Sequence, residues 1–206
     1  MKKILLISIL SLYFFSNNLH AQSQFAQDDY KAYIEKFGKN IVDISTDKIS
    51  DKKKMEKLVS LVDASIDAKW ISRFVLGKHY KLFSSSQFDK FVNIYRDYMI
   101  NSYAPKFLSY KGTMFSVNDV KFQKIFYNVS TEFYAVSNPK PISVSFRVKK
   151  RNDTIFIIDF IPEGISLLES QRSEFDSVIS KKGPADFIEN LSNKVKAMKI
   201  ENEKIK

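Results

Sequence analysis

The spacing of apolar residues changes twice along this chain, from a helical period to a strand period and back. Up to Tyr103, apolar side chains recur every three or four residues, as they do on one face of a helix. From Thr113 to Ile161 they alternate, which is typical of strands with one buried face. After Pro162 the helical spacing returns. Because helices and strands do not alternate, the pattern predicts an α+β domain, with helices packed on one face of a twisted antiparallel sheet of about four strands.

Several local signals predict where the helices begin and end. A short helix after Asp67 is expected to stop at Gly77, since glycine suits the backbone conformation that closes helices. Ser84 and Gln87 form a capping box for a long helix, which Pro105 should kink or end. The inward stripes of the first two helices are predicted to be Tyr30, Ile34, Phe37, Ile41 and Ile44, followed by Met55, Leu58, Val62 and Ile66.

The central strands are predicted from alternation and turn residues. Asn152 and Asp153 form a turn signal between two of them, and Pro139 and Pro141 are expected to mark the preceding turn. Gly183 should separate two C-terminal helices, and the charged tail 197–206 should fray. The alternating residues are Val129, Thr131, Phe133 and Ala135 in one strand and Ile142, Val144, Phe146 and Val148 in the next.

Residues 1–21 have the features of a cleavable secretory signal peptide. Lys2 and Lys3 precede an apolar stretch of about a dozen residues, which is shorter than the ~20 that a membrane-spanning helix needs. The polar run behind it ends at Ala21, a small residue of the kind that signal peptidases favour. Cleavage there would leave one domain, 22–206, with a net charge of +8 instead of +10. An uncleaved N-terminal anchor is the alternative.

Composition removes several classes of chemistry. The chain has no cysteine, which excludes disulfides and thiol catalysis. Once His20 is removed with the signal peptide, His79 is the only imidazole left, so neither a metal site nor a cofactor is predicted. The five glycines are too far apart to form a phosphate-binding loop. The basic clusters 52–54 and 149–151 are candidate docking points for nucleic acid, anionic lipid or an acidic protein, or they only provide solubility.

Two stretches resemble the MlaC, or toluene-tolerance, family. The first runs from Arg73 to Tyr80, and the second runs from Asp159 through Glu163 and Gly164 into an Arg-x-x-Phe pattern at Arg172. Arg172 stands out because its spacing places it on an apolar helix stripe, where it would pair with Asp159 or Glu163 or bind a lipid phosphate. The sequence departs from the family at Ile155, where a tryptophan is usual, and at Pro162.

The resemblance implies a periplasmic phospholipid carrier rather than an enzyme. Such a protein has an NTF2-like cone with an apolar cavity for acyl chains, and it moves lipid between an outer-membrane lipoprotein complex and an inner-membrane ABC transporter. Inward alternation predicts a cavity wall, and the family motifs predict structural positions. The candidate lipid-binding residues are Tyr95, Met99, Tyr103, Phe133, Val144, Phe146, Ile157 and Arg172, and the structural ones are Arg73, Gly77, Asp159, Glu163 and Gly164.

Two alternative functions remain open on the sequence. The first is an exported hydrolase on an NTF2-like scaffold, with a carboxylate or His79 in its cavity. The second is a module that docks on anionic membranes through residues 52–54 without enclosing a lipid.

Overall fold

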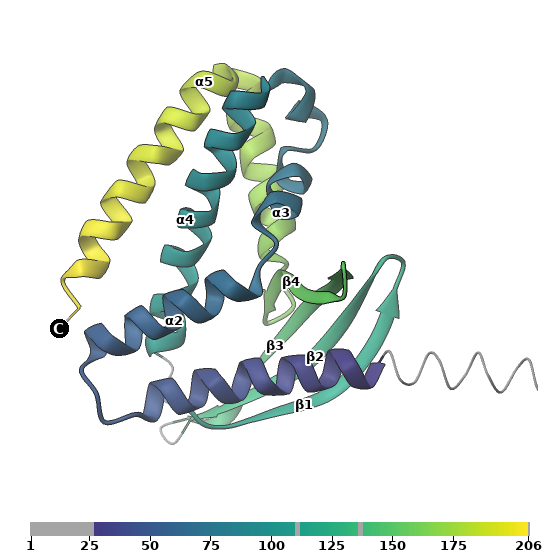
Figure 1. The fold of residues 1–206 in the computed structure, drawn as a ribbon, viewed down its shortest axis with the longest axis vertical. Coiled ribbons are helices and arrows are strands. Elements are labelled where there is room, and N and C mark those ends of the chain that lie inside the picture. The colour runs from purple at the N-terminus through teal and green to yellow at the C-terminus, as the bar shows by residue number, and fades with distance from the viewer. Residues whose placement is uncertain (1–26, 110–111, 136–137, 206) are drawn as a thin grey trace, which may run out of the picture.

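The computed structural model describes residues 27–109, 112–135 and 138–205, which form a layer of helices packed against a four-stranded sheet (Figure 1). The order of elements is helices, then four strands, then a long broken helix, so the predicted α+β class is confirmed. The predicted signal peptide lies outside the described residues.

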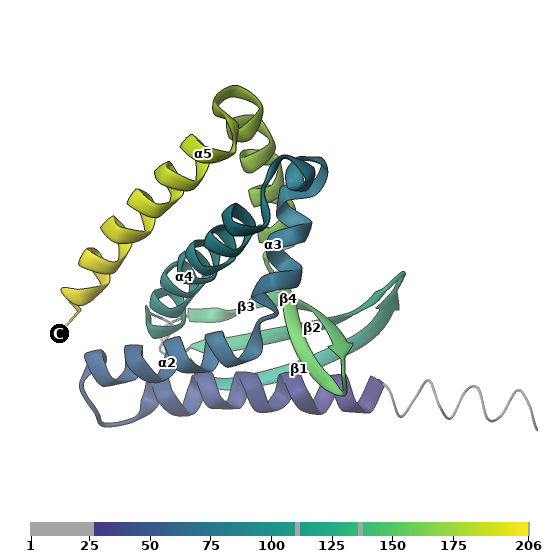
Figure 2. The ribbon, with the colours of Figure 1, turned by 45° about the horizontal axis from the view of Figure 1, so that its top comes forward.

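The helical layer begins with a helix over residues 27–46, followed by α2 (Asp51–Ser65), α3 (Ala68–Leu76), the 3-10 helix η1 (Gly77–Leu82) and α4 (Ser85–Ser109). The predicted inward stripes of the first two helices are buried, apart from the half-buried Ile44. Figure 2 shows the first helix running along the sheet. Its Tyr30 stacks on Tyr127 near one end of the sheet, and its Phe37 meets Phe146 further along.

The predicted helix boundaries near Gly77 and Ser84 are confirmed. Gly77 closes α3 with a positive φ of 50°, and its N–H donates to the carbonyls of Arg73 and Phe74. Before α4, the Ser84 N–H donates to Gln87 Oε1 at 2.9 Å, while the Gln87 N–H donates to Ser84 Oγ at 3.2 Å. This reciprocal pair satisfies two backbone donors that a helix start leaves without partners.

The sheet is an antiparallel meander in the order β1-β2-β3-β4, comprising β1 (Gly112–Gln123), β2 (Phe126–Ala135), β3 (Asn138–Arg151) and β4 (Thr154–Pro162). The register pairs Val129 with Phe146, and Phe146 with Phe160, so one face carries a continuous apolar row. Asn152 and Asp153 both have positive φ, at 47° and 62°, as the predicted tight turn requires.

Pro139 and Pro141 do not act as the sequence predicted, and Pro105 does not end its helix. Pro139 and Pro141 lie within β3 rather than in the turn before it. Pro105 lies inside α4, which continues to Ser109. A proline removes the N–H that would bond the carbonyl four residues earlier, and that carbonyl, on Asn101, accepts from Asn202 Nδ2 at 3.2 Å instead. A long-range partner therefore compensates for the lost helical bond.

The last element, α5 (Leu167–Glu203), is two helices separated at Gly183, whose φ of 77° and ψ of 171° are not helical. This confirms the predicted separation. Residues 197–203, the first part of the tail predicted to fray, continue this helix to Glu203. Lys199 Nζ pairs with Asp97 Oδ2 at 2.6 Å, so this end of α5 is attached to α4.

Candidate functional site

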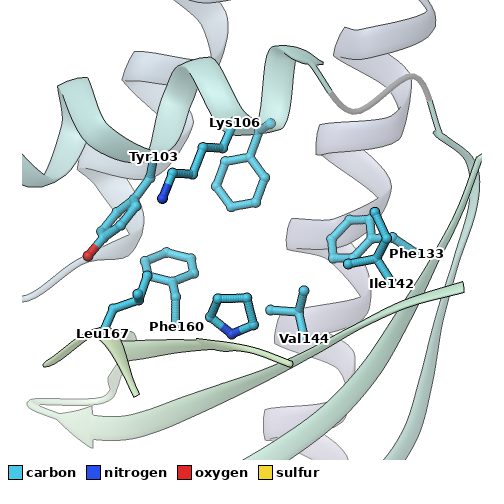
Figure 3. A pocket seen from close by; sticks show the side chains of 9 residues that line it. Tyr103, Lys106, Phe133, Ile142, Val144, Phe160 and Leu167 are labelled. Carbon is cyan, nitrogen blue, oxygen red and sulfur yellow. The ribbon is translucent and has the colours of Figure 1, made fainter. Parts of the chain in front are cut away.

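An apolar cavity lies between the C-terminal end of α4, the start of α5 and the sheet (Figure 3), and its volume is about 300 Å³. Tyr103 and Phe107 come from α4, and Leu167 is the first residue of α5. The strands supply the opposite wall. All of these side chains but one are apolar or aromatic, and the full lining is Tyr103, Lys106, Phe107, Phe133, Ile142, Val144, Phe160, Pro162 and Leu167.

Aromatic rings from four segments form the floor of the cavity and the layer behind it. Phe160 of β4 lies 5.0 Å from Tyr103 and 5.9 Å from Phe107, measured between ring centroids. Behind them, Phe146 packs edge-on against Phe160 at 5.5 Å, and Phe37 of the first helix contacts Phe107 at 6.1 Å. Edge and tilted contacts of this kind are the favourable geometry for aromatic pairs, so this wall is held in place from several directions.

Lys106 is the one charged side chain among the nine lining residues. It is exposed, and its ammonium lies 5.8 Å from the Tyr103 ring centroid. Figure 3 shows its nitrogen on the cavity side of α4. A lysine at this place can keep its charge in water while its methylene stem covers apolar surface.

The structure brings three of the predicted lipid-binding residues to this cavity: Tyr103, Phe133 and Val144. Phe146 and Ile157 are fully buried in the core and do not line it. Tyr95 and Met99 border a void of only about 10 Å³, which is no larger than one water position. Six lining residues are not among those that the sequence predicts to bind lipid, because tertiary packing rather than local spacing decides which side chains border a cavity: Lys106, Phe107, Ile142, Phe160, Pro162 and Leu167.

A buried hydrogen-bond chain joins the cavity to the helical core. The Tyr95 hydroxyl donates to Gln171 Oε1, and Gln171 Nε2 donates to the Tyr103 hydroxyl at 3.0 Å. Burial raises the pKa of both tyrosines, that of Tyr95 well above its usual value. The hydroxyls therefore stay neutral, and each has a partner in the dry interior.

Asp159 links the end of β4 to the start of α5. Its carboxylate is buried and accepts from the Leu168 N–H at 3.0 Å, from the Ser166 hydroxyl at 2.6 Å and from Arg147 Nη1 at 3.2 Å. Desolvation raises the pKa of Asp159 above its ordinary value, although these three donors lower it. At the same joint, Glu163 has a φ of 49°, and its N–H donates to the Ser143 carbonyl at 3.0 Å.

The predicted orientation of Arg172 is wrong. Gln171 is buried and Arg172 is exposed, so the inward stripe passes through position 171. Among the described residues Arg147, not Arg172, pairs with Asp159. The Arg172 guanidinium lies 4.8 Å above the Phe74 ring and covers Gly77, where an added Cβ would lie 2.9 Å from Nη2. Arg172 does not line the cavity, and Arg73 stacks similarly on Tyr80 at 4.6 Å.

His79 does not have the geometry of a catalytic triad. Its Nε2 lies 2.8 Å from Asp176 Oδ1 and 3.5 Å from Ser180 Oγ, so both groups meet the same ring nitrogen. A triad needs the carboxylate on one nitrogen and the hydroxyl on the other. His79 also lies outside the lining of the apolar cavity. Within the described ranges no cluster of three or more metal-ligating residues is present, and no helix is long and apolar enough to cross a bilayer.

Comparison with known proteins identifies the family. The family model described as "MlaC protein" matches residues 23–193. The chain belongs to the MlaC family. The fold of this family member is similar to that of a phospholipid-binding protein from Ralstonia solanacearum, solved in complex with a phospholipid. The TM-score is 0.71 at 18% sequence identity, and the match covers 82% of this chain and 98% of the other. A search of curated proteins found no match.

Membership of the MlaC family agrees with the resemblance seen in the sequence. MlaC proteins are phospholipid carriers rather than enzymes, which accounts for an apolar cavity without a constellation of reactive groups.

Proposed function

We propose that this protein is a periplasmic carrier that encloses phospholipid acyl chains in the cavity between α4, the start of α5 and the sheet. The observation that carries the proposal is the apolar lining, in which only Lys106 is charged. At about 0.8 kcal/mol per buried methylene, even part of one acyl chain gains several kcal/mol by leaving water. The headgroup can stay in solvent next to Lys106, whose ammonium complements a phosphate.

The size of the cavity bears on how a lipid is held. At about 300 Å³ it lies at the lower end of the range of roughly 300–1,000 Å³ found for ligand pockets. This space accommodates part of one chain, so enclosing two requires the wall to move outward. The half-buried residues Ile142, Val144 and Leu167 are better placed to move than the fully buried Phe146 behind them.

The proposed partners follow from family membership. The carrier would receive or deliver lipid at an outer-membrane lipoprotein complex and at an inner-membrane ABC transporter, and so maintain the lipid asymmetry of the outer membrane. The Ralstonia solanacearum protein, which holds a phospholipid in a similar fold, supports the ligand class. The secretory features of residues 1–21 support the periplasmic location.

The test is to purify residues 22–206 from a bacterial periplasm, extract the protein with organic solvent and identify bound phospholipid by mass spectrometry. About one diacyl phospholipid per chain, retained through a high-salt wash, is the expected result. Salt screens surface charges but does not release an enclosed acyl chain. Folded protein that stays lipid-free, even after incubation with vesicles, would contradict the carrier function.

A further inference from the structure

The tip of the β1–β2 hairpin exposes two large apolar side chains. Phe122 is 60% exposed and Ile125 is 59% exposed, and every residue from Lys121 to Ile125 is exposed. Figures 1 and 2 both show this tip projecting beyond the other strands. Single apolar residues on a surface are ordinary, but two together at the end of a projecting hairpin form a small exposed apolar patch.

The turn between β1 and β2 does not contain the residue types that two-residue hairpin turns usually contain. Two-residue hairpin turns favour Gly, Asn and Asp, yet this one has Lys124 with a φ of 57° followed by Ile125. A lysine at positive φ is uncommon, and a β-branched residue gains nothing from a solvated turn. The sequence thus places an apolar side chain at the outermost point of the hairpin, where folding does not require it.

The tip is also held stiffly. The Phe122 ring lies 5.0 Å from the Tyr127 ring, and Tyr127 stacks on Tyr30 of the first helix with 4.1 Å between ring centroids. This aromatic column runs from the exposed tip into the core, where Tyr30 is 8% exposed. Contacts made by the tip would therefore be transmitted to the whole domain rather than absorbed by a loose loop.

The charged side chains of the tip itself, Lys121 and Lys124, are both basic. From residue 120 to residue 131 the sequence has no acidic residue, whereas Lys121 and Lys124 both lie in this stretch. In the antiparallel meander the basic run 149–151 ends β3 at the same end of the sheet as the β1–β2 turn. Asp119 and Asp153 pair with Lys121 and Lys150 respectively. A negatively charged surface complements this end of the molecule.

We propose that the hairpin tip, Lys121–Ile125, is a membrane anchor that enters the headgroup region of an anionic bilayer. Phe122 and Ile125 would reach the apolar boundary while the lysine ammonium groups bind lipid phosphates. The cavity residues Phe133 and Ile142 pair at the opposite end of β2 and β3. The tip would accordingly hold the protein on a membrane with its cavity directed away from that membrane. This anchor does not depend on whether the cavity carries lipid.

The test is flotation of the mature protein with vesicles of phosphatidylcholine mixed with phosphatidylglycerol, compared with vesicles of phosphatidylcholine alone. Binding to the anionic vesicles should weaken about tenfold or more in Phe122→Ser/Ile125→Ser and in Lys121→Glu/Lys124→Glu. The matched control is Ile200→Ser, which removes a side chain that is also 60% exposed but lies on α5. It should bind like wild type. Circular dichroism verifies that each variant is folded.

Two results would overturn the anchor. In the first, the Phe122→Ser/Ile125→Ser variant binds anionic vesicles as tightly as wild type. In the second, neither wild type nor the Phe122→Ser/Ile125→Ser variant binds vesicles, and sedimentation shows that only wild type self-associates. The tip would then contact a second copy of the chain instead of a membrane. A variant with a filled cavity, Val144→Trp, should keep its vesicle binding, because the anchor and the cavity lie at opposite ends of the sheet.

Discussion

The ring of Phe115 on β1 lies directly on Gly38 of the first helix, so closely that a Cβ added at Gly38 would overlap the ring. This contact holds the first helix on the sheet close to Phe37, which supports the cavity floor. A glycine inside a helix normally costs about 1 kcal/mol relative to alanine. Its presence here is explained by the close approach of the ring.

Gly38→Ala should therefore destabilise the protein, although helix propensity alone predicts a gain. The expected loss is about 1–3 kcal/mol in the free energy of unfolding, the usual cost of overpacking, measured by urea denaturation. Phe115→Leu in the same chain should restore part of the loss, because the smaller side chain makes room for the methyl group. A stabilised Gly38→Ala variant would show that the helix does not pack this closely.

Asp159→Ala should lower the free energy of unfolding by about 3 kcal/mol, since it removes one partner from a buried charged network. Arg147, whose side chain is only 18% exposed, would keep Glu169 as its partner, while the Leu168 N–H would lose its acceptor. The matched control is Glu35→Ala. That carboxylate is 51% exposed in its pair with Lys31, and its removal should change stability by less than about 0.5 kcal/mol.

Asp159 should also make stability depend on pH in a direction opposite to that of most carboxylates. Because its pKa is raised in the folded protein, it contributes stability below the pKa of an unfolded aspartate, about 4. That contribution is lost as the pH rises through the folded pKa. The free energy of unfolding of wild type should therefore fall relative to that of Asp159→Asn as the pH rises from about 4. A difference that moves the other way would show that hydrogen bonds outweigh desolvation.

Val144→Trp should reduce the amount of co-purified phospholipid several-fold, because the indole fills much of a cavity of about 300 Å³. The control is Ser143→Trp, which adds the same ring at the neighbouring exposed position on the other face of β3. Lipid is measured by mass spectrometry against protein concentration. Equal amounts of phospholipid on both variants would show that the acyl chains do not occupy this cavity.

The chain formed by Tyr95, Gln171 and Tyr103 should show strong non-additivity. Tyr103→Phe leaves a buried amide N–H without a partner and should cost about 1–3 kcal/mol in the free energy of unfolding. The triple variant Tyr95→Phe/Gln171→Met/Tyr103→Phe removes every polar group of the chain and should lose less than the single losses added together. Additive losses would mean that the three side chains act independently.

Periodicity predicted the elements well, because alternation and helical spacing are local properties of the sequence. The turn at Asn152 and Asp153 and the capping box at Ser84 were also predictable, since each depends on residues within a few positions. The continuation of α4 past Pro105 and of α5 to Glu203 could not be predicted in this way. Both involve the hydrogen bond between Asn202 and Asn101, which are about a hundred positions apart in the sequence.

The cavity was predictable only in part for the same reason. Tyr103, Phe133 and Val144 lie on inward faces that alternation and helical spacing identify, and all three line it. Phe160 belongs to a β4 segment in which residues 157–161 are all buried, so alternation cannot select it. Helical spacing places Arg172 on the wrong face because positions 171 and 172 both continue the spacing from Leu168, and only the tertiary structure shows that Gln171 points inward.

The separation of α4 from α5 along the chain has a consequence for how the protein acquires its structure. Each strand of the meander pairs with the next, so the sheet can form from contacts between residues close in sequence. Phe91 and Tyr95 of α4, by contrast, are covered by Phe175 and Phe187 of α5. Synthesis proceeds from the N-terminus, so these rings stay uncovered until α5 has emerged. The period before α5 docks is when this chain is most exposed to aggregation and most in need of a chaperone.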